Sequence, residues 1–314
     1  MFCYQCEETV KGTGCTIKGV CGKEEEIAAY QDVLVYLCKG ISVRNLVAME
    51  KKKGDPDAGL FIADALFATL TNVNFDKARF TEMINRAVAI RDRLPPSGNT
   101  EPDACTWKPK GDYDILEKAK SVGILSTANE DVRSLRSTLL FGLKGISAYY
   151  THAAVLGKTD AVITTFLQKG LASMLRDLPV PDMIALVMEC GSTGVNVLAL
   201  LDAANTSAYG KPQITSVKTT VGTRPGILIT GHDLKDLEQL LEQATRTAKR
   251  QAAPFSKGPP KPGANARPWV VHHARQMLST LQGSIKVDIA ELQNAENFGR
   301  LMAVFLWVYA LMSP

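Results

Sequence analysis

Residues 24–49, EEEIAAYQDVLVYLCKGISVRNLVAM, decide the fold class of this chain. Their apolar residues recur every three to four positions, as on one face of an α-helix: Ile27, Tyr30, Val33, Leu34, Leu37 and Ile41. The same period continues over 58–70 and 77–93, and after a Pro/Gly-rich break at 95–110 it returns over 130–156, 160–176 and 181–201. The sequence therefore predicts two sets of three helices.

The two sets are related by a constant offset of 105 residues. The tetrapeptide KGIS at 39–42 recurs at 144–147, and Phe61, Leu66, Leu70 and Met83 recur as Phe166, Leu171, Leu175 and Met188. Scattered leucine matches arise by chance, whereas an identical tetrapeptide at the same offset favours an internal duplication. We expect a mainly α protein in which two related three-helix units pack as a helical bundle over residues 24–220.

The hydrophobic period changes near residue 226. A short apolar stretch, GILIT at 226–230, predicts a strand, and a helix is expected to follow from Asp233 through Leu241. Residues 221–245 are thus predicted to start an incomplete α/β, Rossmann-like domain. The Lys-, Arg-, Pro- and Gly-rich stretch at 246–268 is typical of a linker, so residues 246–314 are predicted to form an atypical linker and a C-terminal helix.

The composition narrows the classes of function. A chain of 314 residues with 46% hydrophobic and 22% charged residues is typical of a globular protein. Its formal charge of +4 is dispersed, which predicts neither a nucleic-acid partner nor an anionic membrane. The longest apolar run, 301–312, is shorter than the roughly 20 residues of a spanning helix. Since the first residues do not resemble a signal peptide, we expect a cytoplasmic protein.

Four of the seven cysteines lie within the first 21 residues, at the spacing C-x2-C-x8-C-x5-C: Cys3, Cys6, Cys15 and Cys21. In a reducing compartment, such crowding indicates metal or redox chemistry before disulfides. A cubane iron-sulfur cluster needs four thiolates, and the interleaved glycines let the backbone approach it closely. The alternative is a structural zinc site, which normally pairs two short cysteine knuckles or a knuckle with histidines. No catalytic role is expected for Cys38, Cys105 or Cys190.

His232 is a second candidate ligand. It lies between the predicted strand and helix, where α/β domains bind ligands. The alternative is a helix-capping turn in which Asp233 is the cap and His232 is merely exposed. We expect His152, His272 and His273 to be packed or solvated side chains.

Several segments resemble known sequences over about residues 1–243. They are MFCYQCEET at 1–9, GCTIKGVCGK at 14–23, GIL at 123–125, NEDVRSLR at 129–136, HAAVLG at 152–157, LDAANT at 201–206, and 226–241. In these segments the chain is similar to hybrid cluster proteins, also called prismane proteins or hydroxylamine reductases. The resemblance implies an oxidoreductase that reduces hydroxylamine or nitric oxide, a small nitrogen substrate, with electrons from a donor protein.

The resemblance also implies cofactors and their ligands. Cys3, Cys6, Cys15 and Cys21 would bind a [4Fe-4S] cluster, because members with wider spacing bind [2Fe-2S]. His232 would be a ligand of a second centre, the family's hybrid [4Fe-2O-2S] cluster. The family's further cysteine and glutamate ligands have no counterpart after Gln243, which leaves an alternative: a non-catalytic iron-sulfur electron-transfer fragment without a complete hybrid cluster.

Overall fold

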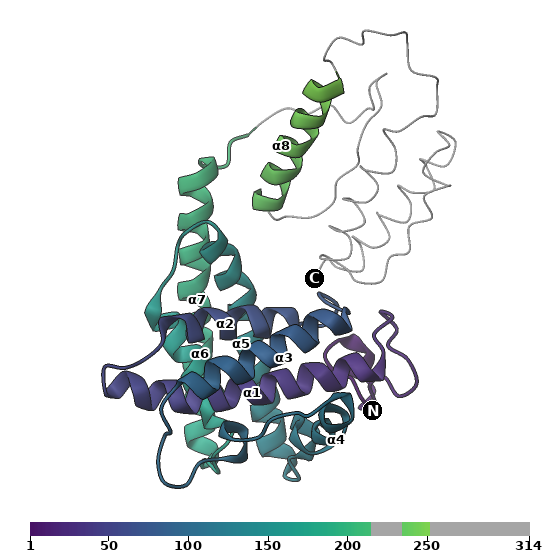
Figure 1. The fold of residues 1–314 in the computed structure, drawn as a ribbon, viewed down its shortest axis with the longest axis vertical. Coiled ribbons are helices and arrows are strands. Elements are labelled where there is room, and N and C mark those ends of the chain that lie inside the picture. The colour runs from purple at the N-terminus through teal and green to yellow at the C-terminus, as the bar shows by residue number, and fades with distance from the viewer. Residues whose placement is uncertain (215–233, 252–314) are drawn as a thin grey trace. The chain divides into compact units, whose positions relative to one another are not determined.

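The structure, a computed structural model, describes residues 1–214 and 234–251, with side chains described as far as residue 243 in the second segment (Figure 1). The chain divides into one compact unit, Met1–Gly210, and a second that begins at Lys211. The predicted end of the helical domain at residue 220 and the predicted strand at 226–230 lie outside the described residues.

The described residues form eight α-helices and no strand, which confirms the mainly α prediction. The helices are α1 (Glu25–Glu50), α2 (Pro56–Ala68), α3 (Lys77–Arg93), α4 (Asp112–Val122), α5 (Glu130–Val155), α6 (Ala161–Ser173), α7 (Val180–Tyr209) and α8 (Leu234–Gln251). Three short 3-10 helices join them: η1 (Glu7–Thr9), η2 (Asp103–Cys105) and η3 (Ile124–Ser126). Helix α4 was not predicted, and α8 continues to Gln251, into the predicted linker.

The helix bounds repeat at the predicted offset. Helices α1 and α5 both have 26 residues and α2 and α6 both have 13, and each pair begins 105 positions apart. Even the N-caps correspond: the Asp55 side chain accepts a hydrogen bond from the Asp57 amide, and the Asp160 side chain accepts one from the Val162 amide. This agreement supports an internal duplication.

Helices of the two repeats pack against each other rather than as separate bundles. Helix α1 lies against α3 and α4 but also against α6, while α2 packs on α5 and α6, and α5 packs along α7 (Figure 1). The side chains between them are fully buried, among them Leu34, Leu37, Leu66, Leu143 and Leu171. Burying each such leucine stabilises the fold by about 1.5–3 kcal/mol.

The Pro/Gly-rich segment after α3 is fixed to the bundle. The buried Arg91 guanidinium donates to the Ala104 carbonyl (3.1 Å) and to the Trp107 carbonyl (2.6 Å). Gly40 of α1 lets this segment come close, since a Cβ there would lie 2.0 Å from the Ala104 oxygen. The segment between the repeats is therefore part of the core, not a loose connection.

Among the described helices, one is long and apolar enough to cross a membrane by length and composition. It is α7, Val180–Tyr209, and 22% of its most apolar window is buried. Core helices of water-soluble proteins pass the same test, so the finding is weak evidence and does not place the chain in a membrane.

Candidate metal centre

The N-terminal cysteines lie on a loop that backbone hydrogen bonds close on itself. Cys3 and Cys15 form an isolated antiparallel bridge, in which the Phe2 amide donates to the Cys15 oxygen and the Cys15 amide to the Cys3 oxygen, both at 2.9 Å. Gly14 makes this approach possible, because a Cβ there would lie 2.1 Å from the Cys3 oxygen. The first and third cysteines are thereby held side by side.

Short turns fix the other two cysteines. The Cys6 carbonyl accepts hydrogen bonds from the Thr9 amide (3.1 Å) and the Thr9 hydroxyl (2.7 Å). Next to Cys21, Gly22 has a φ of 92°, and its amide donates to the Gly19 carbonyl at 2.8 Å. A positive φ strongly favours glycine, so the interleaved glycines are needed for the path of the loop.

All four loop cysteines are free thiols, with Cys3 buried and the other three half-buried. Burial raises the pKa of the Cys6 thiol, and the nearby thiolates of Cys3, Cys15 and Cys21 raise it further. A hydrogen bond from the Glu8 amide acts in the opposite direction, because it stabilises the Cys6 thiolate. The four sulfur atoms therefore share one region.

The geometry bears on which metal group fits this loop. Within 1–214 and 234–251, no three His, Cys, Asp or Glu side chains meet as ligands of a single ion. A cubane cluster binds each thiolate to a different iron, so its ligands stand farther apart than the four around one zinc ion. Four free thiols on one loop supply the number and kind of ligands that a cubane cluster needs.

Two lysines are buried next to the loop. Lys23 is fully buried, and its ammonium donates to the Gln31 side-chain oxygen at 2.8 Å. Burial lowers the pKa of Lys23, whereas the Cys3 and Cys21 thiolates raise it. Lys144 of α5 is 4% exposed, and its ammonium donates to the Gln5 side-chain oxygen (3.1 Å) and the Thr69 carbonyl (3.0 Å).

Asp32 of α1 lies among these cations. Burial raises its pKa, and Lys144, Lys39 and Lys23 all act to lower it. Burial in turn lowers the pKa of Lys144, and Asp32 acts to raise it. Asp32 therefore offsets part of the charge of the buried lysines, of which Lys23 and Lys144 lie next to the cysteine loop.

These buried charges were missed by the sequence interpretation, although a signal was present. Lys39 and Lys144 both occupy the first position of the repeated KGIS tetrapeptide, within an otherwise apolar helical pattern. A lysine that recurs at the same place in both repeats marks a buried cation, because long charged side chains are rarely fully buried by chance.

The remaining candidate residues lie elsewhere. Cys38, Cys105 and Cys190 are buried in the helical core, and burial raises the pKa of each thiol, to about 11 for Cys105 and Cys190. The His152 ring packs edge-on against Phe67, with the ring centres 5.3 Å apart. The other three histidines, His232 among them, lie outside the described residues.

The sequence family is consistent with this loop. Residues 1–258 match the model of the Prismane/CO dehydrogenase family. The chain belongs to this family. The match takes in the cysteine loop and the whole helical unit.

Several relatives of this chain are hydroxylamine reductases, and they are about half identical to it over the aligned residues. The chain is 49% identical over 256 residues to a hydroxylamine reductase of Desulfitobacterium hafniense and 49% identical over 261 residues to one of Nitratidesulfovibrio vulgaris, in both cases over 79% of this chain and 47% of the relative. It is 48% identical over 250 residues to a hydroxylamine reductase of Chlorobaculum tepidum, over 79% of this chain and 46% of the relative. The chain spans about half the length of the curated relatives it matches.

Proposed function

We propose that this chain supplies the electron-transfer site of a hydroxylamine reductase-type oxidoreductase, with a [4Fe-4S] cluster on Cys3, Cys6, Cys15 and Cys21. The observation that carries the proposal is a loop of four free, mutually interacting thiols, closed by the Cys3–Cys15 bridge. The identity of about half to hydroxylamine reductases supports the type of reaction.

The residues around the loop suit this task. Bound there, a [4Fe-4S] cluster would take up and release single electrons. The Glu8 amide donates a hydrogen bond to the Cys6 sulfur, and Lys23 and Lys144 would offset part of the negative charge of four thiolates. The half-buried positions of Cys6, Cys15 and Cys21 leave an edge of the site near solvent, where a donor protein can deliver electrons.

The substrate assignment follows from the relatives. We infer that hydroxylamine or nitric oxide is the small nitrogen substrate, reduced at a second centre of the hybrid [4Fe-2O-2S] type. His232 is proposed as one ligand of that centre.

A second candidate function is electron transfer without catalysis by this chain. No cysteine follows Cys190, and the three cysteines outside the loop are buried in the helical core. A hybrid centre needs soft thiolate ligands, which this arrangement does not offer near His232 in sequence. The chain would then carry electrons to a centre completed by other residues.

One experiment tests the proposal and separates the two candidates. Hydroxylamine consumption is measured anaerobically with a reduced viologen donor for wild type, His232→Ala and Cys15→Ser. Turnover that is lost in both variants favours a complete enzyme, whereas a cluster that viologen reduces without hydroxylamine consumption favours the electron-transfer function. A chain without any viologen-reducible iron would contradict the proposal.

A further inference from the structure

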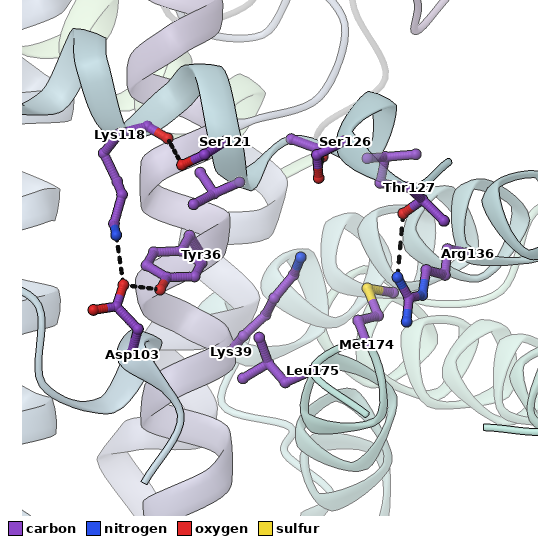
Figure 2. A pocket seen from close by; sticks show the side chains of 13 residues that line it. Tyr36, Lys39, Asp103, Lys118, Ser121, Ser126, Thr127, Arg136, Met174 and Leu175 are labelled. Atoms are coloured by element: carbon purple, nitrogen blue, oxygen red, sulfur yellow. Dashed lines mark hydrogen bonds and ion pairs between the residues drawn. The ribbon is translucent and has the colours of Figure 1, made fainter. Parts of the chain in front are cut away.

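A polar cavity of about 280 Å³ opens among α1, α4, α5 and the end of α6 (Figure 2). None of the four loop cysteines lines it. Its charged lining residues are three cations, Lys39, Lys118 and Arg136, and one carboxylate, Asp103. The Ser121 and Ser126 hydroxyls donate to the Lys118 and Gly123 carbonyls, whereas the Thr127 hydroxyl can add a donor. The charged lining residues give the cavity a positive balance.

Lys39 is the unusual residue of this cavity. Its side chain is 7% exposed, and its ammonium extends into the cavity between the two groups of lining residues (Figure 2). Within the described part of the chain, Lys39 has no hydrogen bond or ion pair. The other cations are engaged: Lys118 binds Asp103 at 2.5 Å, and Arg136 donates to the Thr127 hydroxyl at 3.2 Å. The Lys39 ammonium faces the cavity, and Asp32 stabilises its charge without a hydrogen bond, so its N–H donors are available to a ligand in the cavity.

The internal duplication shows what kind of partner such a lysine takes. The offset of 105 residues relates Lys39 to Lys144 and Tyr36 to Phe141, and Lys144 and Phe141 line a second cavity beside the cysteine loop. There the N-terminal segment occupies the space and leaves only about 10 Å³. The Lys144 ammonium donates to the Gln5 side-chain oxygen at 3.1 Å. In that copy, the repeated lysine is satisfied by the Gln5 oxygen, which comes from outside the two helical repeats, together with the Thr69 carbonyl at the end of α2.

The two cavities differ in charge at corresponding positions. Asp32 lines the Lys144 cavity, whereas its counterpart 105 positions later, Ser137, is neutral and is not among the residues that line the Lys39 cavity. Gln31 lines the Lys144 cavity, and its counterpart 105 positions later is Arg136, which lines the Lys39 cavity. The Lys39 cavity thus has a guanidinium where the Lys144 cavity has the neutral side chain of Gln31. The Lys39 cavity therefore favours an anion, whereas the Lys144 cavity holds the neutral amide oxygen of Gln5. Arg136 also lies 3.8 Å from the Asp177 carboxylate, but that side chain is fully exposed, so the pair screens it only weakly.

We propose that this cavity, the Lys39 pocket, binds a small oxyanion, one oxygen of which accepts a hydrogen bond from Lys39 as the Gln5 oxygen does from Lys144. Arg136 and the Thr127 hydroxyl add further donors to the same anion. Phosphate and small organic phosphates or carboxylates belong to this class and are small enough for the volume. The inference concerns the helical unit alone and does not depend on the iron-sulfur proposal.

The charge state of Lys39 agrees with such a ligand. Burial lowers its pKa to about 8, Asp32 acts to raise it and Arg136 to lower it. The lysine thus remains mainly an ammonium at neutral pH.

The test is a titration of the full chain with inorganic phosphate, followed by ³¹P NMR and calorimetry at low ionic strength. We expect saturable binding to wild type that is at least about tenfold weaker in Lys39→Met, because a charge-assisted hydrogen bond is lost. Arg136→Gln, which copies the residue of the other repeat, is expected to weaken binding as well. Lys120→Met is the matched control, since it removes the same charge from an exposed lysine of α4 outside the pocket and should leave binding unchanged.

Circular dichroism establishes that each variant is folded, and Arg136→Gln carries the test if Lys39→Met does not fold. Absence of saturable phosphate binding by wild type would overturn the proposal, as expected if the pocket instead receives a protein segment. Equal binding by wild type and Lys39→Met, or an equal loss in Lys120→Met, would also overturn it.

Discussion

The repeated KGIS tetrapeptide offers a matched pair of glycines whose substitution should have opposite effects. Gly40 of α1 faces the backbone of η2: a Cβ there would lie 2.0 Å from the Ala104 oxygen, 2.6 Å from the Ala104 carbon and 3.1 Å from the Cys105 nitrogen. Gly145 of α5 has nothing within 4 Å of its Cβ position. The same alanine substitution therefore clashes with backbone atoms at Gly40 and meets no neighbouring atom at Gly145.

The magnitudes follow from this geometry. At Gly145, alanine gains helix propensity of about 0.5–1 kcal/mol. At Gly40 that gain is outweighed, because the obstructing atoms are backbone and Arg91 holds them through the Ala104 carbonyl. Overpacking costs about 1–3 kcal/mol, and a 2.0 Å approach to fixed backbone belongs at the upper end of that range. After subtraction of the propensity gain, Gly40→Ala is expected to destabilise the helical unit by about 2 kcal/mol overall.

The assay is urea unfolding of wild type, Gly40→Ala and Gly145→Ala, followed by far-ultraviolet circular dichroism. Gly40→Ala should lower the midpoint and the melting temperature, the latter by about 4–8 °C for a unit of this size, and Gly145→Ala should raise both slightly. Equal effects of the two substitutions, or a stable Gly40→Ala, would refute the claim that η2 packs directly on α1.

Three further predictions follow from the same structure. Alanine substitution of each buried cysteine, Cys38, Cys105 and Cys190, should leave the iron content unchanged. Loss of iron in any of these variants would show that the substituted cysteine is an iron ligand. Burial would raise the pKa of Glu101, but hydrogen bonds from Arg44 and Ser97 outweigh it and hold the pKa below its ordinary value. The stability from this carboxylate is therefore present above its unfolded pKa of about 4.3 and lost as the pH falls through the lower folded value, so urea unfolding of Glu101→Gln should depend less on pH between about 5 and 3. The last prediction belongs to the second candidate, electron transfer without catalysis: His232→Ala should leave the iron content unchanged and hydroxylamine reduction near background, as in the parent chain, because one imidazole cannot hold a multi-iron centre. Robust turnover that disappears in this variant would contradict that candidate and favour a complete enzyme.

The helical architecture could be predicted because its signal is local. Six of the helices carry an apolar face with helical spacing. The internal duplication adds to this signal, because α1 corresponds to α5 and α2 to α6 at the offset of 105 residues. Helix α4 was missed because it is short, with 11 residues, and follows directly on the Pro/Gly-rich break. Its apolar residues do have helical spacing: Ile115 is buried, and Leu116, Ala119 and Val122 pack against the core. Long-range contacts such as the bond between Lys118 and Asp103 place it in the fold, and these leave no mark in the local sequence.

The thiol ligands of the candidate metal site could be predicted from the sequence, but the charged residues that surround the site could not. The cysteine spacing points to a metal group, since the four thiols and their glycines are adjacent in the chain. The lysines beside the loop depend on packing between distant helices: Lys144 reaches Gln5 across 139 positions of sequence. The lysine repeated in KGIS signals a buried cation, but its partners and the cavity in front of Lys39 arise only when both repeats are assembled, so no local pattern could predict those.

The central claim is that the N-terminal loop holds an iron-sulfur cluster, and its metal content tests this most directly. Protein purified anaerobically should contain about four irons and four acid-labile sulfides per chain, with both lost in Cys15→Ser, because a cubane needs a thiolate at each of its four corners. Electron paramagnetic resonance of the reduced protein should show the signal of a single cubane. A colourless protein with one zinc ion per chain would contradict the account.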